Sequence, residues 1–428
     1  MEEVQTSSSG TVSHETHSAP TLCEFNTSFN SLQSNAATKS TPAAGPPNYY
    51  PASCSFIASL NTTTSQIISC LAVQNDDNYY NLLYAASTEE VNVFDITTLS
   101  LLDTFGSGYS GSVKSIAFSK GRIFTAHQDC RIRVWQKVMT SSSSSSYSRS
   151  KQIMKHHLIQ TLPTFKDRFF NRLSPKNYVR IRRNEHKLRI EHADAVSALT
   201  VNNDVGLMYS VSWDKSFKIW NVSSPDMPCL DSVNEAHADA VNAVAVDPTG
   251  GTVYTGSANG EIKVWKVSKE TKKHMLLTTL SKHASSVNAL ALTMEGSILC
   301  SGGGDRVILV WEREETNNKN NNNNDNNNNK NDLFVGCCLK GHNGAILSLV
   351  CVDNGVVISG SSDKSVRIWK YEKGFVGGCL AVLEGHCKPV KSLVLIPGGD
   401  DGFSVFSGSL DGEIRAWKIV VLDCNSRW

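Results

Sequence analysis

The chain has 428 residues, and its 41 lysine and arginine residues almost balance its 40 aspartate and glutamate residues. This near-neutral charge argues against a protein coated by nucleic acid. The 12 cysteines form no Cys-x-x-Cys pair, so the sequence has neither zinc-finger spacing nor a disulfide framework, and a reduced setting in the cytoplasm or nucleus is expected.

The first 52 residues are rich in serine, threonine, asparagine and proline and carry few large apolar side chains. They are too polar to form a core, so we expect a disordered tail at 1–52, and their acidic start predicts no secretory signal. The run SFIASL at 55–60 follows and predicts a strand. No apolar run approaches the length of a membrane span.

Two repeat-like units come next, at 67–95 and 111–135. The first has Phe94 near its end. The second ends at Trp135 and contains Thr125 and Asp129, but neither unit has a histidine where the later units carry one. We therefore expect two weaker copies of the unit that recurs from residue 192 onward.

The segment 136–189 separates these units from the later ones and carries the strongest local charge of the chain. Its apolar residues recur at spacings of 4, 3, 4 and 4, which predicts an amphipathic helix through Leu158, Leu162, Phe165, Phe169 and Leu173. Between 166 and 189, two acids face nine bases, a net charge of +7: Lys166, Arg168, Arg172, Lys176, Arg180, Arg182, Arg183, Lys187 and Arg189. Either the apolar stripe covers the rim of the repeat domain, or the segment docks an acidic protein, nucleic acid or anionic lipid.

From residue 192 a stricter unit recurs five times, each copy beginning with a histidine and ending at a tryptophan. The two residues are separated by 28, 28, 28, 27 and 31 positions. Within 192–220, short apolar runs alternate with turns rich in Asn, Asp and Gly, which predicts a meander of short strands. A period of forty-odd residues indicates a repeat fold, because one such unit buries too little surface to be stable alone.

These units resemble the WD repeat, the four-stranded blade of a β-propeller. The resemblance implies a hydrogen-bonded tetrad of His, Ser or Thr, Asp and Trp inside each blade. Four sets match in full: His192, Ser210, Asp214, Trp220; His283, Ser301, Asp305, Trp311; His342, Ser359, Asp363, Trp369; and His386, Ser407, Asp411, Trp417. In the remaining set, His237, Thr255 and Trp265 are accompanied by Asn259 in place of an aspartate. We interpret all of these residues as structural, since a buried carboxylate needs hydrogen-bond donors.

The strand ends at 94, 135, 220, 265, 311, 369 and 417 predict seven blades. We thus expect an all-β, seven-bladed WD-repeat β-propeller over 53–421, monomeric, with a short tail at 422–428. Pairing of SFIASL with the last blade would close the ring and remove exposed sheet edges. Residues 316–332 are mostly asparagine and predict a disordered loop between the third and fourth strands of a blade.

A finer resemblance is to a plant group of propellers, the JINGUBANG-like proteins. It rests on LLYAAS–VNVFD–TLSLLDTF (82–105), FTAHQDCRIRVW (124–135), LPTFKDRFF–PKNYVRIRR (162–183) and EHADAVSALTV (191–201). It implies a non-catalytic adaptor, without a cofactor, that regulates other proteins in plant development or signalling. The topology of the propeller family also implies that the 136–189 insertion and the asparagine-rich loop share one face, opposite the turns that hold the tetrad aspartates.

No P-loop, G-x-S-x-G, H-E-x-x-H or paired-carboxylate motif stands outside the tetrads, so we expect no catalytic site and no metal site. A substrate receptor of a ubiquitin ligase is an alternative class. Such propellers usually carry an acid directly after the tryptophan and a base two places beyond it. The tails here are WQKV, WNVS, WKVS, WERE, WKYE and WKIV, and none satisfies both positions. Direct binding of nucleic acid or acidic lipid through 166–189 is the other alternative.

Partner contacts are expected at the turns around the tetrad aspartates, where propellers usually bind. Trp213 is the strongest candidate, because it precedes a tetrad aspartate in a turn with little core to fill. Asp194, Asp239, Gln128 and Leu410 occupy comparable turn positions, and the two acids suggest a partner with basic character. Packing of Trp213 against a neighbouring turn is the alternative.

Overall fold

The computed structural model describes residues 52–61, 67–75, 81–108, 111–141, 152–182, 185–268, 273–313, 333–373, 378–398 and 402–421. The predicted tail before Ala52, the asparagine-rich stretch 316–332 and residues 422–428 lie outside these ranges.

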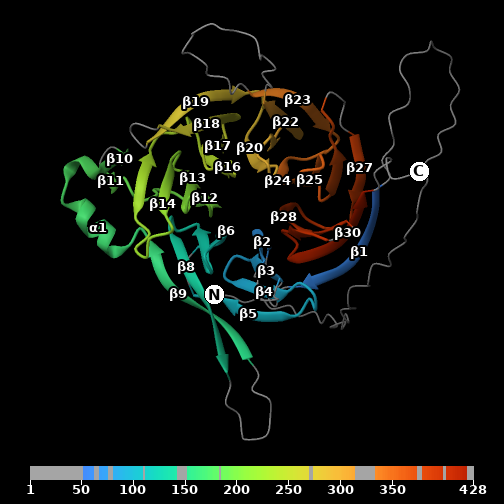
Figure 1. Cartoon of the computed structure of the whole chain (residues 1–428), viewed down its shortest axis with the longest axis horizontal. Helices are drawn as coiled ribbons and strands as arrows, with labels where there is room; N and C mark the ends of the chain where they lie inside the picture. The colour runs from blue at the N-terminus through green and yellow to red at the C-terminus, as the bar shows by residue number, and fades with distance from the viewer. Residues whose placement is uncertain are drawn as a thin grey trace, which may run out of the picture. The chain divides into compact units, whose positions relative to one another are not determined.

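The described part of the chain folds into seven four-stranded antiparallel sheets, which Figure 1 shows arranged as a ring. We call the sheets blades 1 to 7 in chain order. Blade 1 holds β2 (Cys70–Asn75), β3 (Asn81–Ala86), β4 (Val91–Asp95) and β5 (Leu101–Phe105). Blade 2 holds β6 (Val113–Ser119), β7 (Arg122–His127), β8 (Ile132–Ser141) and β9 (Gln152–Leu162), and blade 3 holds β12 (Val196–Asn202), β13 (Leu207–Ser212), β14 (Phe217–Asn221) and β15 (Cys229–Val233).

The remaining four blades repeat this meander. Blade 4 holds β16 (Val241–Val246), β17 (Thr252–Ser257), β18 (Glu261–Val267) and β19 (His274–Ser281), and blade 5 holds β20 (Val287–Leu292), β21 (Ile298–Gly303), β22 (Val307–Arg313) and β23 (Leu333–Lys340). Blade 6 holds β24 (Ile346–Val352), β25 (Val356–Ser361), β26 (Val366–Lys370) and β27 (Gly378–Leu383). Blade 7 holds β28 (Val390–Pro397), β29 (Phe403–Ser409), β30 (Glu413–Val421) and β1 (Ala52–Asn61). The predicted seven-bladed all-β propeller is confirmed.

The first strand in the sequence closes the ring. β1 contains the predicted strand 55–60 and pairs antiparallel with β30 along its whole length, from Ala52 opposite Val421 to Asn61 opposite Glu413. The last blade therefore combines the N-terminal strand with three C-terminal strands. This pairing satisfies the backbone groups that β30 would otherwise expose at its edge.

The core lies between the blades, because each second strand is covered on both faces by neighbouring blades. All six residues of β25 are buried, and Trp220, Trp311 and Trp369 are at most 2% exposed. The packing is close enough to require glycine after a tetrad hydroxyl, as at Gly256, where an added Cβ would lie 2.6 Å from Val287 Cγ1 of the next blade. Seven such interfaces bury the surface that no single blade could.

The helix predicted through Leu158–Leu173 is wrong in its first half. Leu158 and Leu162 lie in β9, the fourth strand of blade 2, and pair with β8. A spacing of four residues is even, so it suits a strand as well as a helix, and here the available partner strand decides. The helix α1 covers Phe165–Arg172, where Thr164 and Asp167 form a capping box directly after Pro163.

The interpretation that the apolar stripe covers the rim holds for Leu158 and Leu162, which pack against core clusters, but is wrong for α1, which has no buried residue. Phe165 is 79% exposed, Phe169 53% and Leu173 71%. The short helix η1 (Pro175–Asn177) and a hairpin of β10 (Tyr178–Arg182) and β11 (Glu185–Leu188) follow α1. Figure 1 shows α1 and this hairpin on the outside of the ring.

We expected the insertion to lie opposite the aspartate turns. This is confirmed for the connection between β8 and β9 and is wrong for the basic part that follows β9. β9 ends at Leu162 opposite Ile132, directly beside the turn that carries Asp129, so the basic part of the insertion leaves blade 2 at the aspartate-turn end. The other end of the β8–β9 hairpin, Ser141 opposite Gln152, leads into the serine-rich stretch. The gap between Arg313 and Leu333, which holds the asparagine-rich stretch, likewise joins the third and fourth strands of blade 5 at the end far from Asp305.

Candidate interaction face and its tetrads

The structure brings together all four members of the tetrads in blades 3, 5, 6 and 7. Each histidine Nε2 lies 2.7–2.9 Å from the serine Oγ, and each Nδ1 lies 2.7–3.1 Å from an aspartate Oδ2. The indole Nε1 donates to the same serine Oγ at 2.8–2.9 Å. A neutral imidazole with its proton on Nδ1 satisfies every group in this chain, from tryptophan through serine and histidine to aspartate.

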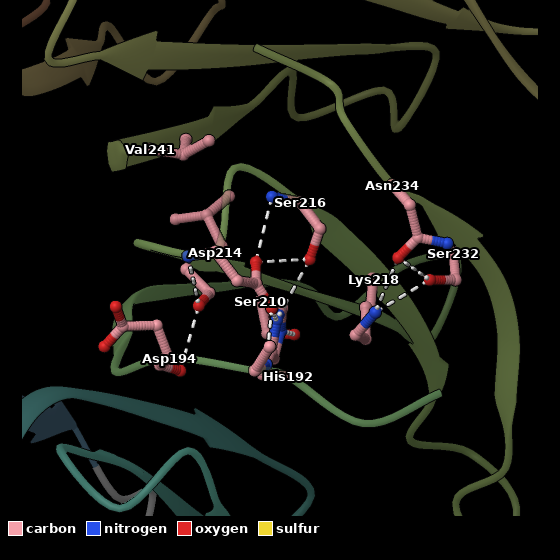
Figure 2. A network of polar contacts seen from close by, with 12 residues as sticks. His192, Asp194, Ser210, Asp214, Ser216, Lys218, Ser232, Asn234 and Val241 are labelled. Atoms are coloured by element: carbon pink, nitrogen blue, oxygen red, sulfur yellow. Dashed lines mark hydrogen bonds and ion pairs between the residues drawn. The ribbon is translucent and has the colours of Figure 1, made fainter. Parts of the chain in front are cut away.

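Figure 2 shows the network of polar contacts in the blade 3 tetrad, in which the charge resides on the carboxylate. Burial lowers the pKa of His192, against the effect of Asp214. Burial alone would raise the pKa of Asp214, but His192, Lys218 and Ser216 hold it well below its usual range. At neutral pH the carboxylate is therefore charged and the imidazole neutral. His192 and Ser210 are buried, so the network stabilises the fold of the blade.

The same carboxylate links two loops on one face of the ring. Asp214 Oδ2 accepts from the backbone N–H of Ala193, 2.7 Å away, in the loop that enters β12. Asp214 Oδ1 accepts from the backbone N–H and Oγ of Ser216 at 2.9 and 2.6 Å, in the turn between β13 and β14. The tetrad thus positions the loops of the predicted interaction face.

Blade 4 lacks this link. His237 Nε2 lies 2.7 Å from Thr255 Oγ1, and Trp265 Nε1 donates to the same hydroxyl at 2.8 Å. Asn259 instead donates through Nδ2 to Glu261 Oε2, and His237 Nδ1 is buried without a hydrogen-bond partner. Burial, assisted by Lys263, lowers the pKa of His237 to about 4.

Blade 2 contains an imidazole that the sequence reasoning missed. His127 lies on the same strand as Thr125, with its Nε2 2.7 Å from Thr125 Oγ1 and its Nδ1 3.2 Å from the carbonyl oxygen of Gly111. Trp135 donates to Thr125 Oγ1 at 2.8 Å, while Asp129 pairs with Arg133. The histidine reaches the hydroxyl from two residues along the strand, so it falls outside the spacing that identifies the other five.

Blade 1 lacks both the tryptophan and the hydroxyl of the tetrad. Phe94 pairs with Leu83 where a tryptophan stands in the other blades, and Ala85 occupies the register position of the hydroxyl. A phenyl ring has no N–H to donate, so an alanine there leaves no polar group unsatisfied.

A buried Asp–His–Tyr set joins blades 1 and 2, and the sequence reasoning missed it. His156 Nδ1 lies 2.9 Å from Asp103 Oδ2, and His156 Nε2 lies 3.2 Å from Tyr84 Oη. Lys155 Nζ also contacts Asp103, at 2.8 Å. Asp103 and Tyr84 lie 53 and 72 residues from His156 in the sequence, so no local spacing reveals the set.

A looser copy of this set joins blades 3 and 4. His274 Nε2 lies 3.4 Å from Tyr209 Oη, and His274 Nδ1 lies 3.8 Å from Asp231 Oδ2. Tyr209 and Asp231 pair with the same residue of β14, Ile219, just as their counterparts in blade 1 pair with one residue of β4. The two sets thus share a tyrosine and an aspartate at the same register of one blade and a histidine on the fourth strand of the next.

The turns that follow the second strands and the loops that enter the first strands share one face, which we call the aspartate-turn face. In blades 2 to 7 the first turn residue donates its backbone N–H across to the entry loop, as Trp213 does to Ala195 O at 3.1 Å. Gln128 and Leu410 hold the same position in blades 2 and 7, whereas Asp194 and Asp239 lie in the entry loops of blades 3 and 4. All five predicted partner-binding residues therefore lie on this face.

Trp213 stands out among them because it is 39% exposed although it is large and apolar. Lys114 Nζ lies 5.5 Å from the centroid of its ring, a cation–π contact across blades 2 and 3. Asp194 and Asp239 each use one carboxylate oxygen to accept from the next residue's N–H at 2.7 Å, and both side chains are exposed.

The basic residues of the insertion differ in their ion-pair partners and in their exposure. Lys166 forms an exposed ion pair with Asp226 at 3.0 Å, and Arg168 Nε lies 3.8 Å from Glu191 Oε1. The exposed bases in this segment are Lys166, Arg172, Lys176, Arg180 and Arg189, while Lys187 is half-buried. Arg183 and the side chain of Arg182 lie outside the described residues. The carbonyl oxygen of Arg189 accepts from the buried Lys218 at 2.6 Å, which attaches the end of the insertion to blade 3.

One group of potential metal ligands occurs among the described residues, formed by His386, Asp411 and Glu413. Two of these are tetrad members that bond each other, and Glu413 pairs with Arg415 at 2.9 Å. No helix in the described ranges has the length and apolar character required to cross a membrane.

Comparison with known families gives matches to the WD domain, G-beta repeat, at residues 185–221, 228–266, 275–312, 335–370 and 377–418. These are the five units that begin with histidine and end at tryptophan, and they correspond to blades 3 to 7. Together with the ring of seven blades, they make the chain a WD-repeat β-propeller protein. Propellers of this class serve generally as non-catalytic interaction domains.

Among individual proteins, the chain is 39% identical over 80 residues to the DENN domain and WD repeat-containing protein SCD1 of Arabidopsis thaliana, covering 19% of this chain and 6% of that protein. It is 35% identical over 92 residues to the small ribosomal subunit protein RACK1z of the same plant, covering 20% and 27%. It is 36% identical over 58 residues to cell division control protein 4 of Saccharomyces cerevisiae, covering 14% and 7%. The chain thus spans a small part of each of these relatives.

Proposed function

We propose that the chain is a non-catalytic scaffold that binds a protein partner on its aspartate-turn face. The observation that carries this proposal is the half-exposed Trp213 at that face, with Lys114 against its ring. Aromatic side chains at such positions often supply much of the binding energy of an interface. The exposed carboxylates of Asp194 and Asp239 lie on the same face and favour a partner that presents basic groups.

We further propose that the protein acts as a JINGUBANG-like regulator in plant development or signalling, in the cytoplasm, the nucleus or both. The support is the set of sequence phrases at 82–105, 124–135, 162–183 and 191–201. Three of these phrases fall in the insertion and in the blades without a complete tetrad, where the general repeat pattern is weakest. They are therefore the positions at which a subgroup can differ from other propellers.

The test is affinity capture with the full chain and with Trp213→Ala, followed by identification of the bound proteins. Leu230→Ala is the matched control, because Leu230 is 56% exposed and lies on the outer strand of the same blade. We expect Trp213→Ala to lower partner recovery about tenfold, equivalent to 1.4 kcal/mol, with the melting temperature within a few degrees of the parent. Equal recovery with Trp213→Ala and the parent would remove this face from the proposal.

A further inference from the structure

The helix α1 has its apolar and polar sides reversed relative to a helix that packs on a core. A surface helix normally turns its apolar side inward. Here Phe165, Phe169 and Phe170 are 79%, 53% and 59% exposed, and the half-buried positions are polar. Since the helix has no buried residue, packing on the propeller does not account for its apolar side.

Polar contacts hold the helix in this orientation. Asp167 caps the helix start through Thr164, and Arg168 faces Glu191 beside the entry to blade 3. Asn177 Nδ2 donates to the carbonyl oxygen of Asn171 at the helix end, 3.2 Å away, which ties η1 to α1. The inward side of the helix is therefore polar, and the ion pairs of Arg168 with Glu191 and of Lys166 with Asp226 link the helix to the propeller.

The exposed aromatic rings form one continuous cluster. The ring centroids of Phe165 and Phe169 lie 6.5 Å apart, and those of Phe169 and Phe170 lie 5.7 Å apart. Leu173, 71% exposed, continues the cluster past the helix end. We call these four residues the apolar wedge. Figure 1 shows the helix that carries it on the outside of the ring.

Exposed basic residues accompany the wedge along the chain. Lys166 lies within the same helical arc, and Arg172, Lys176 and Arg180 follow along the segment, all of them exposed. The segment 166–189 carries a net charge of +7 in a chain whose net charge is +1. Exposed apolar side chains flanked by lysine and arginine are the combination by which peripheral proteins bind the interface of anionic bilayers.

We propose that the apolar wedge and its flanking bases dock the propeller onto an anionic phospholipid surface. A fluid bilayer can take up exposed apolar side chains without a preformed binding site. A folded protein partner would need a groove that fits them. The apolar side chains enter the interfacial region and the bases contact lipid phosphates. Apolar insertion and charge each contribute modestly, so both are needed for stable attachment.

The experiment is flotation of the full chain with vesicles of phosphatidylcholine alone or phosphatidylcholine with phosphatidylserine. We expect binding to the phosphatidylserine vesicles only, weakened by added salt because the bases act through screened charge. The double variant Phe165→Ser/Phe169→Ser and the double variant Arg172→Gln/Lys176→Gln should each lower the apparent affinity about tenfold or more.

The matched control is Leu230→Ser/Met294→Ser, which removes two exposed apolar side chains, 56% and 78% exposed, from elsewhere on the propeller. It should float like the parent, and so should Trp213→Ala, which separates this proposal from that for the aspartate-turn face. Absence of flotation, or flotation unchanged in both insertion variants, would overturn the proposal. A third outcome would also overturn it: the parent does not bind vesicles but binds a protein or single-stranded RNA, and Phe165→Ser/Phe169→Ser loses that ligand. The wedge would then be assigned to that ligand.

Discussion

Blades 3 and 4 stand next to each other in the ring and differ at one position of the tetrad, Asp214 against Asn259. In both blades the histidine, the hydroxyl and the tryptophan make the same short contacts. In blade 3 the carboxylate also accepts from the imidazole and from two loops, whereas in blade 4 the amide bonds to Glu261 and leaves His237 Nδ1 unpartnered. The hydroxyl, indole and imidazole thus assemble without the carboxylate, which adds the connection between the loops.

The comparison separates two roles of the tetrad residues: to satisfy buried polar groups and to connect the loops of one face. The Ser or Thr, His and Trp contacts lie inside the blade and satisfy buried polar groups. The aspartate lies at the surface end, with a side chain 9–14% exposed in the four complete tetrads, and it organises the aspartate-turn face. Blade 4 therefore lacks the carboxylate link to its entry loop, on the face proposed to bind a partner, and that loop is held instead by bonds from Ser257 and Lys215.

The largest effect should come from removing a carboxylate that has all of its bonds. Asp214→Ala leaves the imidazole, the Ala193 N–H and Ser216 without their acceptor, and we expect a loss of about 2–4 kcal/mol in the free energy of unfolding. Asp363→Ala in blade 6 should behave alike, with lower abundance and unchanged partner choice. Urea denaturation of the purified proteins measures the change.

Asn259→Ala is the matched control, because its side chain bonds only with the nearby Glu261. It should cost less than about 1 kcal/mol. Equal losses for Asp214→Ala and Asn259→Ala would show that the carboxylate has no role beyond that of an amide. A well-folded Asp363→Ala protein that loses one specific ligand would make that tetrad part of a binding site.

The tetrads were predictable because the spacing between the histidine and the tryptophan recurs in five units. The number of seven blades followed from the same period. Local spacing could not reveal His127, which replaces the usual histidine from a different position on the blade, or His156, whose partners lie in another blade. Leu158 was misassigned because a spacing of four residues fits both a strand and a helix. For His156 and Leu158 the deciding contacts join segments far apart in the sequence. His127 contacts a hydroxyl only two residues away and escapes notice because it lies outside the repeat spacing.

The outward side of α1 was beyond sequence reasoning for a related reason. The pattern at Phe165, Phe169 and Leu173 correctly indicated an apolar stripe, but a stripe does not specify whether the core or the solvent covers it. The half-buried Asp167 and Arg168 on the other side determine the orientation, together with Glu191. That contact links residues 23 positions apart and depends on how blade 3 begins.

Acid should destabilise the blades with a buried imidazole that lacks a carboxylate. The pKa of His237 is lowered from 6.5 to about 4, and that of His127 likewise, in both cases chiefly by burial. Between these values the unfolded chain binds more protons than the folded chain, so stability falls as the pH drops below 6.5. Each histidine should contribute a loss of about 2 kcal/mol between pH 7 and pH 5.

Urea titrations at the two pH values, on the parent and on His237→Gln, measure this contribution. The variant is less stable at pH 7 but should lose about 2 kcal/mol less than the parent on acidification. An identical pH dependence in parent and variant would mean that His237 keeps an ordinary pKa in the folded state. The lowered pKa values of the tetrad aspartates act in a more acidic range and do not interfere with this window.

The smallest effect should come from giving blade 4 the residue that blade 3 has. Asn259→Asp places a carboxylate where it can accept from His237 Nδ1, in the register that Asp214 occupies relative to His192. One new hydrogen bond to a charged group, partly offset by the cost of burying that charge, should add about 1 kcal/mol to the free energy of unfolding at pH 7. The pKa of His237 should rise in the same variant, since a nearby negative charge favours the protonated ring. Urea denaturation measures the change in stability, and an NMR titration of the His237 ring measures the change in its pKa. A rise in pKa without added stability would show that blade 4 cannot bring its turn and entry loop together. The asparagine would then mark a difference in backbone geometry as well as in charge.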